Sequence, residues 1–153
     1  MSTTFKVIIV SIILIFSSSI IASPIDLTTP IQLDEAKFFV FDKYGNRHLS
    51  QTLQYSKNTE YGWEISFRST LKNHNLTEVV TLPAPTTWGV SANTTISLDR
   101  RSATSKYHLK SPNGKFTHAV FWKYAAGDPP GIYLFDIYID GKKIKSFRIM
   151  VSL

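Results

Sequence analysis

The stretch YGWEISFR at residues 61–68 decides the fold class of this chain. Its odd-numbered positions carry large apolar side chains, namely Tyr61, Trp63, Ile65 and Phe67, and its even-numbered positions carry small or charged ones. Because successive side chains of a strand point to opposite faces of a sheet, this alternation predicts a β-strand with one buried and one wet face. Antiparallel sheets that pack on one side have this pattern.

Further strands are predicted on both sides of this stretch, each bounded by turn-forming residues. They cover residues 36–41, 76–82, 94–98, 104–110, 116–124, 132–139 and 144–151, and residues 49–55 form a weaker candidate. No sustained helical period is visible after the first 22 residues. The pattern predicts an all-β fold, an antiparallel two-sheet β-sandwich of seven or eight strands in a single domain over residues 23–153.

The last two predicted strands, joined around Asp140 and Gly141, allow a prediction of register. Large apolar side chains occupy odd-numbered positions in both strands, but a plain two-residue turn would place Phe135 opposite Ser146. A shift of one residue moves every side chain to the other face. We therefore predict a three-residue loop with Gly141 in the left-handed conformation and Tyr133 opposite Phe147. An exposed Phe147 would contradict this register.

The corner before this hairpin, DPPGIY at residues 128–133, resembles the corner before the penultimate strand of bacterial immunoglobulin-like sandwiches. In that fold an acid and a small residue lead into a tyrosine whose hydroxyl bonds to nearby backbone. Tyr133 matches this tyrosine, and Phe135 stands where antibody-type domains carry a cysteine. Since the chain has no cysteine, the antibody-type subfamily is excluded. The resemblance implies an immunoglobulin-like fold and carries no function with it.

The first 22 residues have the three parts of a secretory signal peptide. Lys6 precedes the apolar run VIIVSIILIF at residues 7–16, and Ala22 supplies the small residue at the exit. The alternative is an uncleaved membrane anchor, because residues 5–22 approach the length that spans a bilayer. The three serines at residues 17–19 and the short apolar centre favour cleavage. We predict a periplasmic or secreted bacterial protein with no membrane span after cleavage, and without disulfides or a lipid anchor because cysteine is absent.

The positive charge of the chain is spread over small clusters. The formal net charge is +6, and basic pairs or triplets occur at residues 100–101 and 142–145. Such a surface can steer acidic polymers toward a protein. Clusters of two or three charges are shorter than the runs that mark binding tails, so we interpret them as solvated turns and predict no nucleic-acid partner.

No catalytic motif is present. The chain lacks cysteine nucleophiles, and it contains no G-x-S-x-G, H-E-x-x-H, phosphate-binding or dinucleotide-binding pattern. Glu60 and Glu64 lie four residues apart on one strand, roughly 13 Å, which is too far for a glycosidase pair. We predict surface charges at both positions, a non-enzymatic protein, and no cofactor.

Two histidines are weak candidates for a metal site. His108 and His118 flank the turn at residues 112–114. A three-residue loop would place them opposite each other on one face, whereas a two- or four-residue loop would place them on opposite faces. A structural zinc site normally needs four ligands, and nothing nearby completes the set. His118 also shares a face with Phe116 and Val120, which favours a core-edge position. A small hydrolase, the weakest alternative, would need a cleft that gathers both histidines and a carboxylate.

Binding is the remaining function class, with two candidate surfaces. Trp88, in the loop at residues 83–89, could stack on a sugar or anchor a partner, or it could plug one end of the sandwich. Leu134, Tyr138 and Met150, together with Ile132, form an apolar set on the back of the final hairpin, unless the segment at residues 25–33 covers it. We expect an exported domain that binds a protein or cell-envelope component. The alternative is a carbohydrate-binding module that uses loop aromatics.

Overall fold

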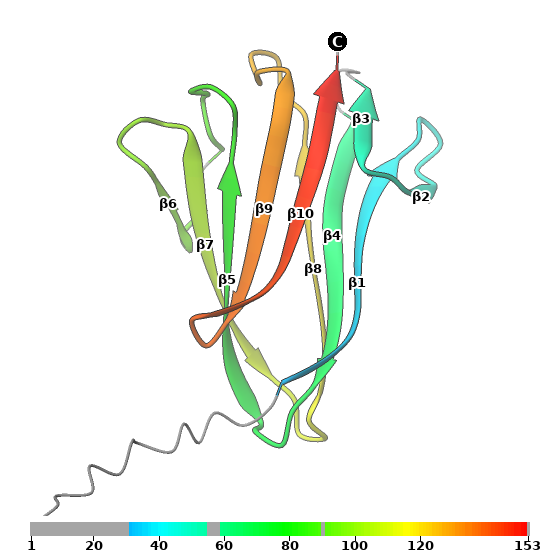
Figure 1. Cartoon of the computed structure of the whole chain (residues 1–153), viewed down its shortest axis with the longest axis vertical. Coiled ribbons are helices and arrows are strands. Elements are labelled where there is room, and N and C mark those ends of the chain that lie inside the picture. The colour runs from blue at the N-terminus through cyan, green and yellow to red at the C-terminus, as the bar shows by residue number, and fades with distance from the viewer. Residues whose placement is uncertain (1–30, 55–58, 90, 153) are drawn as a thin grey trace, which may run out of the picture.

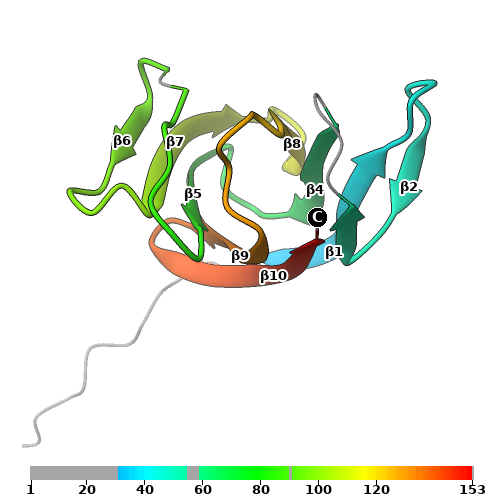
Figure 2. The same ribbon diagram turned by 90° about the horizontal axis from the view of Figure 1, so that it is seen from above.

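The computed structural model describes residues 31–54, 59–89 and 91–152, and these form two β-sheets packed face to face (Figures 1 and 2). The four-stranded sheet has the order β2-β1-β4-β8, and the six-stranded sheet has the order β3-β10-β9-β5-β7-β6. The predicted two-sheet sandwich is thereby confirmed, with ten described strands in place of the predicted seven or eight. Its described strand pairs are antiparallel except that of β3 and β10, which is parallel. No helix in the described ranges is long and apolar enough to cross a membrane. The predicted signal peptide, residues 1–22, lies outside the described residues.

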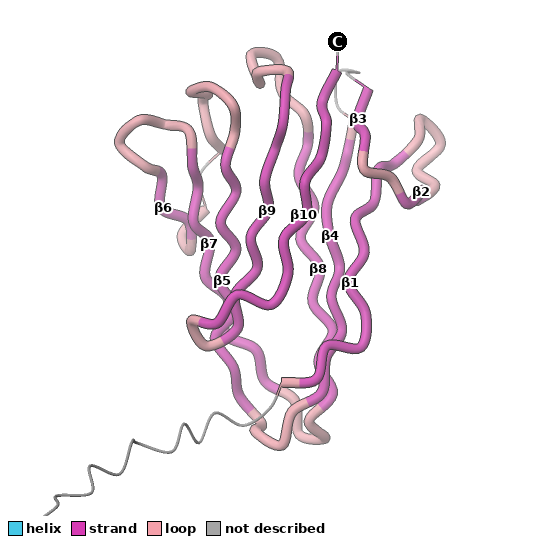
Figure 3. The backbone as a smooth tube through the Cα atoms, in the orientation of Figure 1, coloured by secondary structure: helices cyan, strands magenta, loops and turns pink. Residues whose placement is uncertain are grey.

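The two sheets contain ten strands in the described part of the chain (Figure 3). The four-stranded sheet comprises β1 (Gln32–Phe41), β2 (Arg47–Leu49), β4 (Glu60–Arg68) and β8 (Lys115–Lys123). The six-stranded sheet comprises β3 (Thr52–Gln54), β5 (Asn73–Thr81), β6 (Thr94–Ile96), β7 (Ser102–Lys110), β9 (Gly131–Ile139) and β10 (Lys142–Ser152). The weak candidate at residues 49–55 corresponds to the end of β2 and to β3, which lie in different sheets.

The core lies between the sheets and is rich in aromatic side chains. Tyr61, Trp63, Ile65 and Phe67 of β4 are all at most 5% exposed, as their alternation predicts. Phe38 of β1 reaches across to the other sheet, where its ring contacts others, including Phe135 at 5.2 Å and Phe147 at 5.7 Å between centroids. Burying a side chain of this size contributes about 1.5–3 kcal/mol, so a dense aromatic core can hold the sandwich without disulfides.

The β9–β10 hairpin confirms the predicted faces but not the predicted turn. Phe147 is buried, and Gly141 is left-handed with φ +81°. Asp140 is left-handed as well, with φ +49°, so the turn has two residues and Ile139 pairs with Lys142. The extra residue enters later, where the register shifts between Lys143 and Lys145.

The consequence is a different cross-strand pairing from the one predicted. Phe147 lies opposite Phe135, and Tyr133 lies opposite Ile149. A bulge inside β10 returns the apolar side chains to the core as effectively as a longer loop would, because either one inserts a single residue. The prediction of a three-residue loop was therefore wrong, although its reason, the need to keep Phe147 inside, was right.

The corner before β9 has the hydrogen bond that the resemblance implied. The Tyr133 hydroxyl donates to the carbonyl oxygen of Pro129 at 2.8 Å, and the Tyr133 ring is buried. The carboxylate of Asp128 accepts from the backbone N–H of Ala125 at 2.8 Å and from the Thr86 hydroxyl at 3.0 Å. The bond from Ala125 lies within the loop between β8 and β9, and the bond from Thr86 ties this loop to the loop after β5.

Candidate functional site

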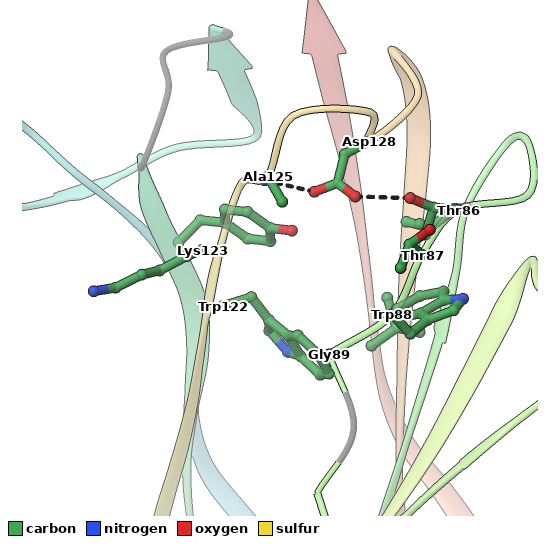
Figure 4. Close-up of a pocket in the computed structure, with 11 residues that line it drawn as sticks. Thr86, Thr87, Trp88, Gly89, Trp122, Lys123, Ala125 and Asp128 are labelled. Atoms are coloured by element: carbon green, nitrogen blue, oxygen red, sulfur yellow. Dashed lines mark hydrogen bonds between the residues drawn. The ribbon is translucent and has the colours of Figure 1, made fainter.

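A small pocket lies at the end of the sandwich where the loop after β5 meets the loop after β8 (Figure 4). Its volume is about 60 Å³, well below the roughly 300–1,000 Å³ of ordinary small-molecule sites. Its lining includes Thr86, Thr87, Trp88, Trp122, Lys123 and Asp128. Asp128 already accepts hydrogen bonds from two neighbours, so the pocket has few free polar groups for a ligand.

Trp88, the predicted loop aromatic, lies beside this pocket and packs against the core. It is half-buried, and its indole N–H donates to the carbonyl oxygen of Arg100 at 2.8 Å. Its ring meets that of Trp122 at a steep angle, 76°, with centroids 6.2 Å apart. These contacts agree with the alternative interpretation in which Trp88 closes one end of the sandwich.

A buried carboxyl group, Glu78 on β5, lies between the sheets. Its Oε1 accepts from the indole N–H of Trp63 at 2.6 Å and of Trp122 at 3.1 Å, and the side chain is fully buried. Its Oε2 has no hydrogen-bond partner among the described residues. Burial raises the pKa of Glu78 to about 7, against the two indole bonds, which lower it.

Glu78 is absent from the sequence-based predictions, although a signal for it exists. The predicted strand at residues 76–82 alternates, and Glu78 stands on the same face as the buried Leu76 and Val80. An acid on the apolar face of a strand needs an internal hydrogen-bond donor. Trp63 and Trp122 are distant in sequence, so only the packing of the two sheets reveals them as the donors.

A second buried polar pair joins β5 to the β9–β10 turn. His74 is 2% exposed, and its Nδ1 lies 2.6 Å from Oδ2 of Asp140. The rings of Phe67 and Phe116 make edge-to-face contacts with the imidazole of His74. Its Nε2 is buried without a hydrogen-bond partner among the described residues. The pair therefore resembles part of a catalytic triad in composition, but its outer nitrogen is enclosed, which suits a structural role.

His108 and His118 do not face each other, and the geometry considered for a shared metal was wrong. His108 lies on β7 in one sheet and His118 on β8 in the other, because residues 111–114 connect the two sheets. His108 is exposed, with its Nδ1 3.1 Å from Oδ1 of Asn75. The described ranges contain no group of three or more metal-ligating side chains.

His118 has the core-edge position that its apolar neighbours favoured. It is half-buried, with ring centroids 5.9 Å from Trp63 and 4.7 Å from Tyr107. Burial lowers its pKa. Its Nε2 has no hydrogen-bond partner among the residues that the structure describes.

The outer face of the four-stranded sheet carries an aromatic cluster that the sequence pattern did not indicate. The guanidinium of Arg47 lies 5.0–5.7 Å from the ring centroids of Phe39, Phe41 and Phe121. Arg47 also pairs with Glu64 at 3.3 Å, while Lys123 pairs with Glu60 at 2.9 Å. Both glutamates are thus partly exposed members of surface ion pairs, as expected.

Phe121 can lie across the sheet because its neighbour on β4 is Gly62. A Cβ atom at Gly62 would come within 2.7 Å of Cδ1 of Phe121 and within 2.1 Å of the carbonyl oxygen of Val120. Glycine in a strand often marks such a close approach. The chain's own arginine lies over this cluster, and Phe121 is still 39% exposed.

The apolar back of the final hairpin is open to solvent in the described part of the chain. Leu134 is 37% exposed and Met150 is 46% exposed, while Ile132 and Tyr138 are half-buried. Register places Met150 opposite Ile132, and Leu134 opposite Arg148. We call this surface the β9–β10 outer face. Residues 25–30, part of the segment expected to cover it, lie outside the described residues.

The chain belongs to the PM0630 beta sandwich domain family, whose pattern matches residues 36–152. No curated protein matches the chain in sequence. Among solved structures, the chain is similar to an immunoglobulin-like protein from Pseudomonas aeruginosa, with a TM-score of 0.55 at 11% identity. That likeness covers 82% of this chain and 99% of the other, and it shows the immunoglobulin-like fold alone.

Two other solved structures are similar over one of their parts. An alkylpurine DNA glycosylase from Pseudomonas fluorescens has a TM-score of 0.49 at 6% identity, covering 80% of this chain and 30% of the other. A β-glucosidase from Listeria innocua has a TM-score of 0.41 at 11% identity, covering 76% and 16%. These likenesses are too distant to support an argument about activity.

Proposed function

We propose that this member of the PM0630 beta sandwich domain family is an exported, non-enzymatic binding domain that recognises a protein or cell-envelope component through the β9–β10 outer face. The observation that carries the proposal is the exposure of Leu134 and Met150 on adjacent strands. Contiguous apolar surface that stays in water commonly marks an interaction site. Methionine is also well suited to contact surfaces, because its side chain is flexible and polarizable.

The burial of Glu78 and His74 favours a binding function over a catalytic one. Glu78 is 0% exposed, and His74 is 2% exposed with aromatic rings against it. A general acid or base must come within hydrogen-bond reach of a substrate, and neither side chain does so in this arrangement. Both instead bond to groups of their own chain, Trp63 and Trp122 for Glu78 and Asp140 for His74.

Carbohydrate binding through Trp88 is the less favoured alternative. The pocket beside Trp88 is about 60 Å³, and the indole N–H already donates to Arg100. A sugar would therefore have to stack on the exposed part of a ring that also packs against the core.

Site-specific crosslinking tests the proposed face. Because the chain has no cysteine, Met150→Cys provides a single attachment point for a photoreactive maleimide. The matched control is Tyr44→Cys, at a 77% exposed position in the β1–β2 loop. We expect the Met150 probe to give a discrete adduct in envelope preparations that the Tyr44 probe does not give.

A second substitution links the adduct to the face itself. Leu134→Asp leaves the core unchanged, since Leu134 points outward, and should remove the adduct formed from position 150. Equal labelling from positions 44 and 150, or an adduct that survives Leu134→Asp, would exclude this face as the binding surface.

A further inference from the structure

A row of basic side chains lies on β7, on the same outer face of the six-stranded sheet. Lys106, His108 and Lys110 occupy alternate exposed positions of β7, opposite Thr77, Asn75 and Asn73 of β5. No ion pair involves Lys106 or Lys110 among the described residues. A surface hollow of about 430 Å³ lies between β5 and β7, and Lys106 and His108 of this row line it.

The basic row continues across the sheet to the β9–β10 outer face. Thr77 pairs with Tyr138, and Nζ of Lys143 lies 5.4 Å from the centroid of the Tyr138 ring. Seen from above, β7, β5, β9 and β10 follow one another along one side of the sandwich (Figure 2). The basic row and the exposed Leu134 and Met150 therefore belong to one surface.

This surface is positively charged because its single acid is already paired. Asp136 is the one acidic side chain among the outward positions of β5, β7, β9 and β10, all of which are described. Its carboxylate accepts from Nζ of Lys143 at 2.8 Å and also bonds to the Ser146 hydroxyl. Lys106, Lys110 and Arg148 form no ion pair among the described residues.

We infer that the outer face of β5, β7, β9 and β10 docks on a bilayer that contains anionic phospholipids. Lysine is depleted from protein–protein interfaces, whereas it is favoured next to anionic headgroups. Leu134 and Met150 supply apolar side chains that can enter the interfacial region between basic anchors. The inference rests on the proposed function and specifies its envelope component as an anionic lipid surface.

Vesicle sedimentation tests the inference, with the protein purified in the form that the cell exports. We expect binding to vesicles of equal parts phosphatidylglycerol and phosphatidylcholine, and little binding to pure phosphatidylcholine. Raising the ionic strength should weaken the binding, because salt screens exposed charges. Failure to bind the anionic vesicles at low ionic strength would overturn the inference.

A matched pair of double variants separates the face from net charge. Lys106→Gln with Lys110→Gln should lower the partition coefficient about 25-fold, at about fivefold for each lysine. Lys43→Gln with Lys123→Gln removes the same charge from the β1–β2 loop and the end of β8, and should change the partition coefficient far less. Equal losses from the two double variants would overturn the inference.

Two further readouts decide the identity of the partner. A solvatochromic dye on Met150→Cys should shift its emission on anionic vesicles, while the dye on Tyr44→Cys should not. Equally tight binding to duplex DNA, with the same dependence on Lys106 and Lys110, would overturn the lipid assignment. A protein adduct from position 150 without vesicle binding would overturn the lipid surface and leave the proposed function standing.

Discussion

At the scale of single residues, Glu78 is the most unusual group in the structure. It lies on the six-stranded sheet, and its two donors, Trp63 and Trp122, lie on the four-stranded sheet. One carboxylate oxygen therefore bridges the two sheets through an otherwise apolar core. Taking a carboxyl group out of water disfavours its charged form, and this cost exceeds the benefit of the two indole bonds.

The raised pKa of Glu78 predicts a loss of stability with rising pH. The pKa is about 7 in the folded chain against an ordinary 4.5, so between these values the folded state binds more protons than the unfolded state. The free energy of unfolding should then fall as pH rises through this window, by about 3 kcal/mol in total. Urea unfolding near pH 5 and near pH 8 measures the difference.

Glu78→Gln is the control for this pH dependence. Glutamine can still accept from both indoles but does not titrate, so the variant should lose less stability between the two pH values. The lowered pKa of His118 acts in the opposite direction in both proteins, because a buried neutral histidine gains stability as pH rises. The same slope in the wild type and the variant would show that Glu78 does not titrate in this range.

At the scale of elements, the β9–β10 hairpin is held by its turn as well as by its strands. The backbone N–H of Asp140 donates to the carbonyl oxygen of Asn75, and its carboxylate accepts from the N–H of Asn75 and contacts His74. The turn is therefore fixed to β5. The left-handed conformation of Asp140 and Gly141 is what allows so tight a connection.

Gly141→Ala should destabilise the protein by about 1 kcal/mol, since an L-residue is strained at a left-handed position. A Cβ atom there would meet nothing within 4 Å, so the loss comes from the backbone alone. Gly89→Ala is the matched control, because its Cβ also has free space and its φ is not in the left-handed region. Thermal unfolding of the two variants compares them, and equal effects would rule out the backbone explanation.

At the scale of the whole molecule, the two sheets present different outer surfaces. The four-stranded sheet pairs its glutamates with basic side chains and places Arg47 over the ring of Phe121, which is 39% exposed. The six-stranded sheet leaves Leu134 and Met150 in water beside the lysines of β7, which form no ion pair among the described residues. Basic side chains without an acidic partner, next to exposed apolar ones, are the reason to assign binding to the six-stranded sheet.

Export is a prediction at this scale, because it concerns the chain as a whole. Cleavage after Ala22 should yield a mature protein that begins at Ser23, and intact-mass measurement of the exported protein checks it. Replacing Ala22 with a bulky residue such as Tyr should block the cut and leave the precursor in the membrane fraction. A mature mass that still includes residues 1–22 would instead support the membrane anchor.

Much of the fold could be predicted because strand formation depends on local alternation. The pattern of residues 61–68 located β4 and its buried face, and the corner at residues 128–133 led to the Tyr133 hydrogen bond. The candidate site was harder to predict from the sequence. His108 and His118 were expected across one hairpin, but a turn signal does not reveal whether the next strand stays in the same sheet.

The sequence by itself determined the all-β class, the buried faces of the main strands and the apolar back of the final hairpin. Each follows from a period of two residues along one short segment. Only the tertiary structure decided how the strands other than the final hairpin pair, where the bulge of β10 lies, and that Trp63 and Trp122 meet Glu78. These features depend on contacts between residues far apart in the chain, whose free energies are settled by the packing of the whole sandwich.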